Sequence, residues 1–238
     1  IPMDTKIAPF NDNNIRRALK YGINREEMVE KILFGYGSVG NDHPIGAGQA
    51  YYNTELEQIS YDPDKAKFYL KEAGLDSIDI DISASDAAFG GAVDAAVLYQ
   101  NSAKAGGVNL NVIREPNDGY WSDVWMKKGM VFSYWGGRPV EDQMFATAYK
   151  CGASWNESYW CNDRFDDLMV KARAELDPAK RREMYFEMQM LCATEGGSVI
   201  PMFNDFVFAV NDKVMTPEQM GSNWDVDGSR WSERWWMA

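Results

Sequence analysis

Hydrophobic positions spaced by three and four residues predict helices in the first third of the chain. Residues 14–34 are expected to form a helix that is broken once, with Asn24 capping its second piece. Asp62-Pro63 predicts the start of another helix, because a capping residue followed by proline is common there, and Gly74 ends it. A loop rich in glycine and proline is expected between them, over residues 35–60.

The pattern then alternates between strand and helix. Short apolar runs predict strands, and longer amphipathic runs between them predict helices. The expected elements are a strand over Ile78–Ala84, a helix over Val93–Ala105, a strand over Val108–Arg114, a helix over Asp118–Met126 and a strand over Val131–Trp135. Alternation at this spacing indicates an α/β layer with crossover connections.

Two further amphipathic helices are expected after this layer. Each has four apolar side chains on one face: Phe165, Leu168, Met169 and Ala172 in the first, and Met184, Met188, Leu191 and Cys192 in the second. Asp177-Pro178 caps the second helix, and Gly196-Gly197 ends it.

The C-terminal part has a different pattern. Val199–Phe203 and Phe206–Val210 predict two strands that meet at Asn204-Asp205. Residues 211–238 show almost no periodicity, although they contain four tryptophans: Trp224, Trp231, Trp235 and Trp236. Rings of this size are seldom left in water, so they either pack on this domain or belong to a surface that meets a partner.

Composition and charge exclude two classes of function. Of the 238 residues, 45% are hydrophobic and 25% are charged, as in ordinary globular proteins. The net charge is −12. Phosphate backbones repel such a chain, so we expect no nucleic-acid partner. No apolar run reaches about 18 residues, so we expect no membrane-spanning segment.

Two features that suggest catalysis or a cofactor are better explained otherwise. Residues 35–40 match the dinucleotide-binding pattern G-x-G-x-x-G, but they follow a helix and enter a loop, which favours a glycine-rich turn. His43 is the only histidine, so we interpret it as a polar loop residue. The acidic residues mostly occupy first turns or exposed helix faces, and no carboxylate pair stands out. We therefore expect no cofactor and no metal site.

The cysteines predict one disulfide. Cys151 and Cys161 flank a loop, and a bond between them would close it easily and place the chain in an oxidising compartment. Cys192 lies on an apolar helix face and is expected to be a buried free thiol. Asn156-Glu157-Ser158 matches the glycosylation sequon, which has meaning only in a eukaryotic secreted chain.

The most informative stretch for binding is Ser133–Pro139. A predicted strand ends in aromatic rings, two glycines allow close approach of the backbone, and Arg138 follows. Ligands of α/β sheets gather beyond such strand ends, and aromatic faces beside a guanidinium suit a small ligand with a carboxylate. The alternative is a tight turn with Trp135 in the core and Arg138 paired with Asp142.

Several segments, in order along residues 9–210, together resemble the dipeptide/oligopeptide/nickel solute-binding proteins of ABC importers. They are Pro9-Phe10-Asn11-Asp12 with Ile15-Arg16-Arg17-Ala18-Leu19 and Ile23-Asn24-Arg25-Glu26, then Tyr61-Asp62-Pro63-Asp64-Lys65-Ala66 with Ala73-Gly74, then Phe165-Asp166 through Asp177-Pro178, and finally Ile200-Pro201-Met202. The resemblance implies an α/β lobe of the periplasmic-binding-protein type, a mixed sheet flanked by helices, with a C-terminal return segment.

The resemblance also implies a domain organisation. Family members are much longer than this chain. Residues 1–205 are therefore expected to be the C-terminal lobe of a two-lobed protein, and residues 206–238 a hinge return and tail that pack on a missing N-terminal lobe. The chain is expected to be a fragment of a protein whose signal peptide has been removed.

The implied function is solute binding by lobe closure, without catalysis, for delivery to an ABC permease. The implied location is the periplasm, or the outer face of the membrane in a Gram-positive host. A carbohydrate-binding or carbohydrate-active protein using exposed tryptophans and acidic residues is the alternative from another class. A nickel or haem carrier of the same fold is a third possibility, against which the single histidine argues.

The resemblance gives Arg138 a specific meaning. In peptide-binding relatives an acidic residue follows the turn that Trp135-Gly136-Gly137 resembles, and it holds the ammonium group of the peptide. A guanidinium cannot hold an ammonium, so the expected solute is peptide-like or opine-like with an anionic group at this point. The candidate ligand-binding residues are Tyr134, Trp135, Gly136, Gly137, Arg138 and Asp142, with Trp155 and Asn156 on the Cys151–Cys161 loop as secondary candidates.

Overall fold

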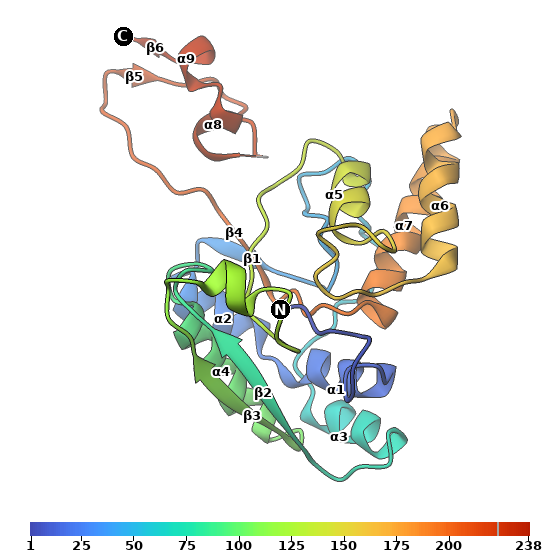
Figure 1. Cartoon of the computed structure of the whole chain (residues 1–238). Helices are drawn as coiled ribbons and strands as arrows, with labels where there is room; N and C mark the ends of the chain where they lie inside the picture. Colours follow the sequence, from blue (N-terminus) through green and yellow to red (C-terminus); the bar gives the residue numbers. More distant parts are fainter. Residues whose placement is uncertain (223) are drawn as a thin grey trace.

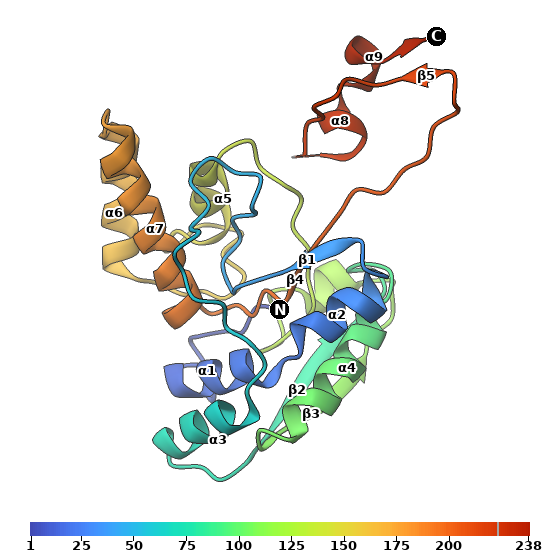
Figure 2. The ribbon, with the colours of Figure 1, turned by 180° about the vertical axis from the view of Figure 1, so that it is seen from behind.

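The structure is a computed structural model of the chain, and it describes residues 1–222 and 224–238. Figures 1 and 2 show it from opposite sides. The main elements are α1 (Asn13–Gly22), α2 (Arg25–Ile32), β1 (Gly37–Val39), α3 (Pro63–Glu72), β2 (Ile78–Ala84), α4 (Ala92–Lys104), β3 (Val108–Arg114), η1 (Tyr120–Val124), α5 (Glu141–Ala148), α6 (Asp163–Ala174), α7 (Pro178–Glu195) and β4 (Met202–Asn204). Four short elements follow: β5 (Val214–Met215), α8 (Asp225–Ser229), α9 (Trp231–Arg234) and β6 (Trp236–Met237).

The parallel pair β2–β3, with α4 as its crossover, forms the centre of the first half of the chain. The alternating sequence explains the pairing. Ile80 and Ile82 are buried, whereas Asp79 and Asp81 face outward and accept hydrogen bonds, each of 2.8 Å, from asparagines on β3. Both strands and the α4 helix lie where the sequence predicts them, within one residue at each end.

The predicted caps of the N-terminal helices are confirmed. Asn24 accepts a hydrogen bond from the N–H of Glu27 at the start of α2, and Asp62 accepts from two N–H groups at the start of α3. The predicted break between residues 14 and 34 is the two-residue gap between α1 and α2. The helix α4 packs on the sheet, α1 and α2 pack against α4, and the three helices enclose the first hydrophobic cluster.

A second hydrophobic cluster lies between α5, α6 and α7. The predicted apolar faces form most of it: Phe165, Leu168, Met169 and Ala172 from α6, and Met188, Leu191 and Cys192 from α7. Asp177 caps α7 as expected, and Cys192 is a buried free thiol. The two clusters meet where Lys20 of α1 donates from its ammonium to the carbonyls of Cys192 and Ala193.

Four predicted elements differ from the structure. Val131–Trp135 is not a strand beyond Val131, which bridges Ser83 in parallel, because β2 ends at Ala84 and offers no further partner. Asp118–Met126 is a helix only over the single π-helical turn η1, which Gly119 starts with a φ of +77°. Phe206–Val210 is not a strand, and Val199–Phe203 is reduced to β4, because the three residues of β1 already pair fully with β4.

The chain after β4 runs away from the sheet and ends in the small group formed by β5, α8, α9 and β6 (Figures 1 and 2). Asp227 organises this group, accepting hydrogen bonds from Gly221, Arg234 and Trp235. One ring, Trp224, reaches back to the body: a Cβ at Gly136 would lie 2.5 Å from it, so a larger residue at position 136 would require the ring to move. Trp231 and Trp236 are each 54% exposed.

His43 lies in the loop between β1 and α3, as predicted, and it is buried there. It follows Asp42, whose carboxylate pairs with Arg25 at 2.6 Å inside the protein. Neither ring nitrogen of His43 has a hydrogen-bond partner, and the ring lies against Tyr52. Burial lowers the pKa of His43 to about 4, with the Asp42 carboxylate acting in the opposite direction, so the ring is neutral at pH 7.

Candidate functional site

The extended segment that follows the sheet is positioned by side chains rather than by strand pairing. The N–H of Phe132 donates to the carbonyl of Ser83, which is its last bond to β2. The hydroxyl of Tyr120, on η1, donates to the carbonyl of Phe132 at 2.7 Å. From Ser133 onward the segment leaves the sheet, and it presents two aromatic side chains and two glycines beyond the strand end.

Glu157 holds this segment, although no sequence pattern marks it as a site residue. Its carboxylate accepts hydrogen bonds from the hydroxyl of Ser133 at 2.5 Å, from the indole N–H of Trp135 at 2.8 Å and from the indole N–H of Trp125. In the sequence Glu157 stands out only as the middle residue of a sequon. No local pattern distinguishes it from the other acidic residues, because its partners lie 22 to 32 positions away.

Aromatic rings continue on both sides of this carboxylate. Trp121 contacts both Trp125 and Tyr134, and Trp135 contacts Trp155, with 5.8 Å between ring centroids in each case. Tyr134 is 60% exposed and Trp155 is 51% exposed. We call the five rings Trp121, Trp125, Tyr134, Trp135 and Trp155 the aromatic wall. Exposed rings in this number next to a strand end are typical of a ligand-binding surface.

Arg138 lies on the aromatic wall and has no carboxylate partner. Its guanidinium stacks 5.5 Å from the ring centroid of Trp135 and donates to the carbonyls of Gly136 and Gly137. The alternative in which Arg138 pairs with Asp142 is wrong, because Asp142 accepts from Arg173 of α6 at 2.6 Å. This leaves the charge of Arg138 without an opposite charge within 4.0 Å among the described residues.

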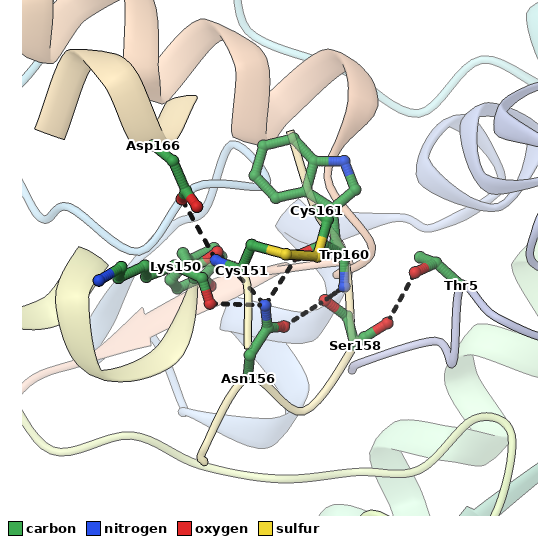
Figure 3. The surroundings of a disulfide bond; sticks show 9 residues. Thr5, Lys150, Cys151, Asn156, Ser158, Trp160, Cys161 and Asp166 are labelled. Carbon is green, nitrogen blue, oxygen red and sulfur yellow. Dashed lines mark hydrogen bonds between the residues drawn. A yellow bond between two sulfur atoms is a disulfide. The ribbon is translucent and has the colours of Figure 1, made fainter. Parts of the chain in front are cut away.

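The loop over residues 151–161 is closed by the predicted disulfide between Cys151 and Cys161 (Figure 3). The side-chain amide of Asn156 donates to three carbonyls, those of Tyr149, Lys150 and Trp160, and Asn156 is only 2% exposed. Asn156 therefore supports the loop from within. Trp155, the other secondary candidate, lies on the outside and lines an open depression with Lys150 and residues 151–154.

Removing this disulfide should destabilise the protein by on the order of 2–3 kcal/mol, because the bond restricts a closed loop of about ten residues in the unfolded chain. A Cys151→Ser/Cys161→Ser variant should show a lower urea midpoint than the unmutated protein. Ser154→Ala serves as a control, since it changes an exposed side chain of the same loop and leaves the disulfide closed. An unchanged midpoint in the double variant would contradict the prediction.

The features dismissed as cofactor or metal sites take structural roles. Residues 35–40 follow α2 and contain the short strand β1, which lies within the predicted loop, so none of their glycines opens a helix. Among the described residues, no group of three or more histidine, cysteine, aspartate or glutamate side chains is placed to hold a metal ion. In that same part of the chain, no helix combines the length and the apolar character needed to cross a membrane.

The comparisons with known proteins identify the family. Residues 1–157, well over half of the chain, match the model of bacterial extracellular solute-binding proteins, family 5 (middle part). The chain therefore belongs to this family. It is 30% identical over 207 residues to the dipeptide-binding protein of Escherichia coli K12, in an alignment that covers 81% of this chain and 37% of that protein.

Solved structures of proteins with this fold are also similar to the chain. The ABC transporter-associated periplasmic binding protein DppA of Helicobacter pylori, in complex with the peptide STSA, matches 99% of this chain and 46% of its own, with a TM-score of 0.76 and 20% identity. The binding protein MoaA of A. tumefaciens R10, in complex with mannopinic acid, matches 90% of this chain and 44% of its own, with a TM-score of 0.76 and 23% identity. The predicted fold class is thereby confirmed, and the chain spans less than half the length of these relatives.

Proposed function

We propose that this chain is the C-terminal lobe of the solute-binding component of an ABC importer, and that it binds a small solute with an anionic group without catalysing a reaction on it. Residues 1–205 form the lobe in this proposal. Residues 206–238 return to an N-terminal lobe, where their exposed tryptophans pack. Family membership and the exposed rings Trp231 and Trp236 support this organisation. The protein acts outside the cytoplasmic membrane, in the periplasm or at the surface of a Gram-positive cell, and delivers its solute to a permease.

The proposed ligand class rests on the hydrogen bonds and the ring contact of the Arg138 guanidinium. A guanidinium that bonds only carbonyls of its own turn and a ring face is available to a carboxylate, for which its planar fork is suited. Tyr134 and Trp135 offer stacking surfaces, and Gly137 leaves the backbone accessible, whereas Gly136 faces the ring of Trp224. The relatives with bound solutes include one with a peptide and one with mannopinic acid, and both kinds of molecule carry a carboxylate. The relatives give no support to the carbohydrate alternative.

Native mass spectrometry of the complete protein, purified without dialysis, tests this proposal. We expect a non-covalent adduct of a small molecule, and we expect its mass to be unchanged after release, because binding involves no chemical step. The two lobes close around the solute because it binds the closed form more tightly. Conversion of the solute on the protein would contradict the proposal. So would a protein that retains no solute and binds none of a panel of short peptides and opines.

A further inference from the structure

A cavity of about 230 Å³ lies where α1 packs against α3 and α7, and it shares no residue with the aromatic wall (Figure 2). Three cations line it: Arg17 and Lys20 from α1, and Lys65 from the first turn of α3. The carboxylate of Glu57 lines it as well. We call this space the cationic cavity. The chain as a whole has a net charge of −12, so the cavity is a local region of opposite sign.

Lys20 is the buried cation of this cavity, with a relative exposure of only 1%. Its ammonium donates to the carbonyls of Cys192 and Ala193 at 3.0 and 2.8 Å, and no third acceptor is present among the described residues. Burial lowers the pKa of Lys20 to about 8, and the Asp42 carboxylate, which opposes this effect, is already paired with Arg25. The ammonium is therefore charged at pH 7 and has one N–H donor left to offer.

The other two cations are held by aromatic rings. The guanidinium of Arg17 lies 4.5 Å from the ring centroid of Tyr69, and the ammonium of Lys65 lies 5.1 Å from that of Tyr21. These two rings stack on each other, with 5.6 Å between their centroids. Lys65 approaches the carboxylate of Asp62 only to 3.9 Å, and in the described part of the chain Arg17 has no carboxylate within 4.0 Å. Both cations are thus positioned without a short ion pair.

From this geometry we propose that the cationic cavity binds a doubly charged tetrahedral oxyanion of the phosphate or sulfate type, either free or as the end group of a small monoester. Ammonium groups and a guanidinium are the side-chain groups that hold such oxyanions. Three positive charges and one negative charge line the cavity, so a double negative charge matches them. The oxyanion would also supply the acceptor that the third N–H of Lys20 lacks.

The hydroxyl of Tyr21 is a further donor at the same place, since this ring lines the cavity. Burial raises the pKa of Tyr21, with Lys65 acting in the opposite direction, so the hydroxyl is protonated at pH 7 and can donate to an oxyanion. A bound oxyanion would connect α1 and α3, which enclose the first hydrophobic cluster, to α7 of the second. This second site does not depend on the proposed function.

Phosphorus NMR of inorganic phosphate near pH 7, with the complete protein added, tests this proposal. The phosphate resonance should broaden in proportion to the protein, and sodium sulfate should restore its width by competition. Sodium chloride at the same ionic strength should not. Glycerol 3-phosphate distinguishes the two sources of the ligand. Competition by this monoester assigns the cavity to a phosphate end group, and competition by sulfate alone assigns it to the free ion.

Variants locate the binding in the cationic cavity. Arg17→Ala/Lys65→Ala should weaken phosphate binding about tenfold or more, because two of the three cations are lost, and neither side chain is buried. Lys67→Ala/Lys71→Ala is the matched control, since it removes two exposed cations of the same helix that do not line the cavity. Lys20→Met, with its folding checked by circular dichroism, should weaken binding to a similar degree because it removes the buried donor.

A phosphate resonance that the protein does not broaden would overturn the proposal, and so would broadening that chloride reverses as readily as sulfate. Equal phosphate affinity in the folded Arg17→Ala/Lys65→Ala protein and its control would do the same. Solute capture in the native mass measurement reports on the other site. A protein that retains its solute but does not bind phosphate disproves the cationic cavity as a site and leaves the proposed function standing.

Discussion

Replacing Arg138 with alanine in the complete protein should weaken binding of its solute by about 2 kcal/mol or more, or about 30-fold, with little effect on stability. The reason is the environment of the guanidinium. It makes no salt bridge within the lobe, so its removal breaks no ion pair of the fold. Once the lobes close, its charge pair with the solute is desolvated, and a carboxylate left without its partner there is costly.

Isothermal titration with the solute identified by native mass measurement checks this prediction. Arg173→Ala is a suitable control, because Arg173 is also partly exposed but is paired with Asp142, in the first turn of α5. Arg138→Lys should recover only part of the affinity, since an ammonium lacks the planar fork that binds a carboxylate with two parallel hydrogen bonds. Unchanged affinity in Arg138→Ala would show that the anionic group of the solute is bound elsewhere.

Local sequence patterns determine much of this fold. The alternation of Ile80 and Ile82 with outward aspartates places β2, and the caps at Asn24, Asp62 and Asp177 place the starts of three helices. The strand predicted over Val131–Trp135 is wrong. The segment has the composition of a strand, but a strand also requires a partner to pair with. β2 ends one residue beyond the bridge at Ser83, and that end cannot be read from the sequence of the segment itself.

The candidate site was predictable only in part, for a similar reason. Aromatic residues followed by two glycines and Arg138 form a continuous motif, so a single stretch of sequence indicates a binding surface. Glu157 belongs to the same site through hydrogen bonds to residues far away along the chain, and no spacing rule connects them. Its neighbour Asn156 is a secondary candidate because it lies on the Cys151–Cys161 loop, but its amide is used by backbone carbonyls within that loop.

The buried pair of Arg25 and Asp42 should be the most sensitive point of the fold. The guanidinium and the carboxylate are 2.6 Å apart and at most 1% exposed. Arg25, at the start of α2, also donates to the carbonyls of Lys20 and Ile59, and Asp42 accepts from the N–H of Ile200. These bonds join α2, the loop after β1 and the segment after α7, where the two hydrophobic clusters meet.

Asp42→Asn should lower the free energy of unfolding by about 3–5 kcal/mol, because it leaves the Arg25 charge buried without an opposite charge. Asparagine has nearly the same shape, tolerates the left-handed backbone at this position, where φ is +56°, and can still accept from Ile200. The charge is therefore the main quantity that changes. Urea unfolding followed by tryptophan fluorescence measures the effect.

The matched control is the pair of Arg182 and Glu55, which lie 2.7 Å apart but are 52% and 69% exposed. Glu55→Gln breaks an ion pair of nearly the same length in water and should cost about 0.5 kcal/mol or less. Equal losses in the two variants would contradict the argument, because burial is the property that separates the pairs. In an Arg25→Met/Asp42→Asn double variant the loss should be smaller than the sum of the single losses, since neither charge is then left alone in the interior.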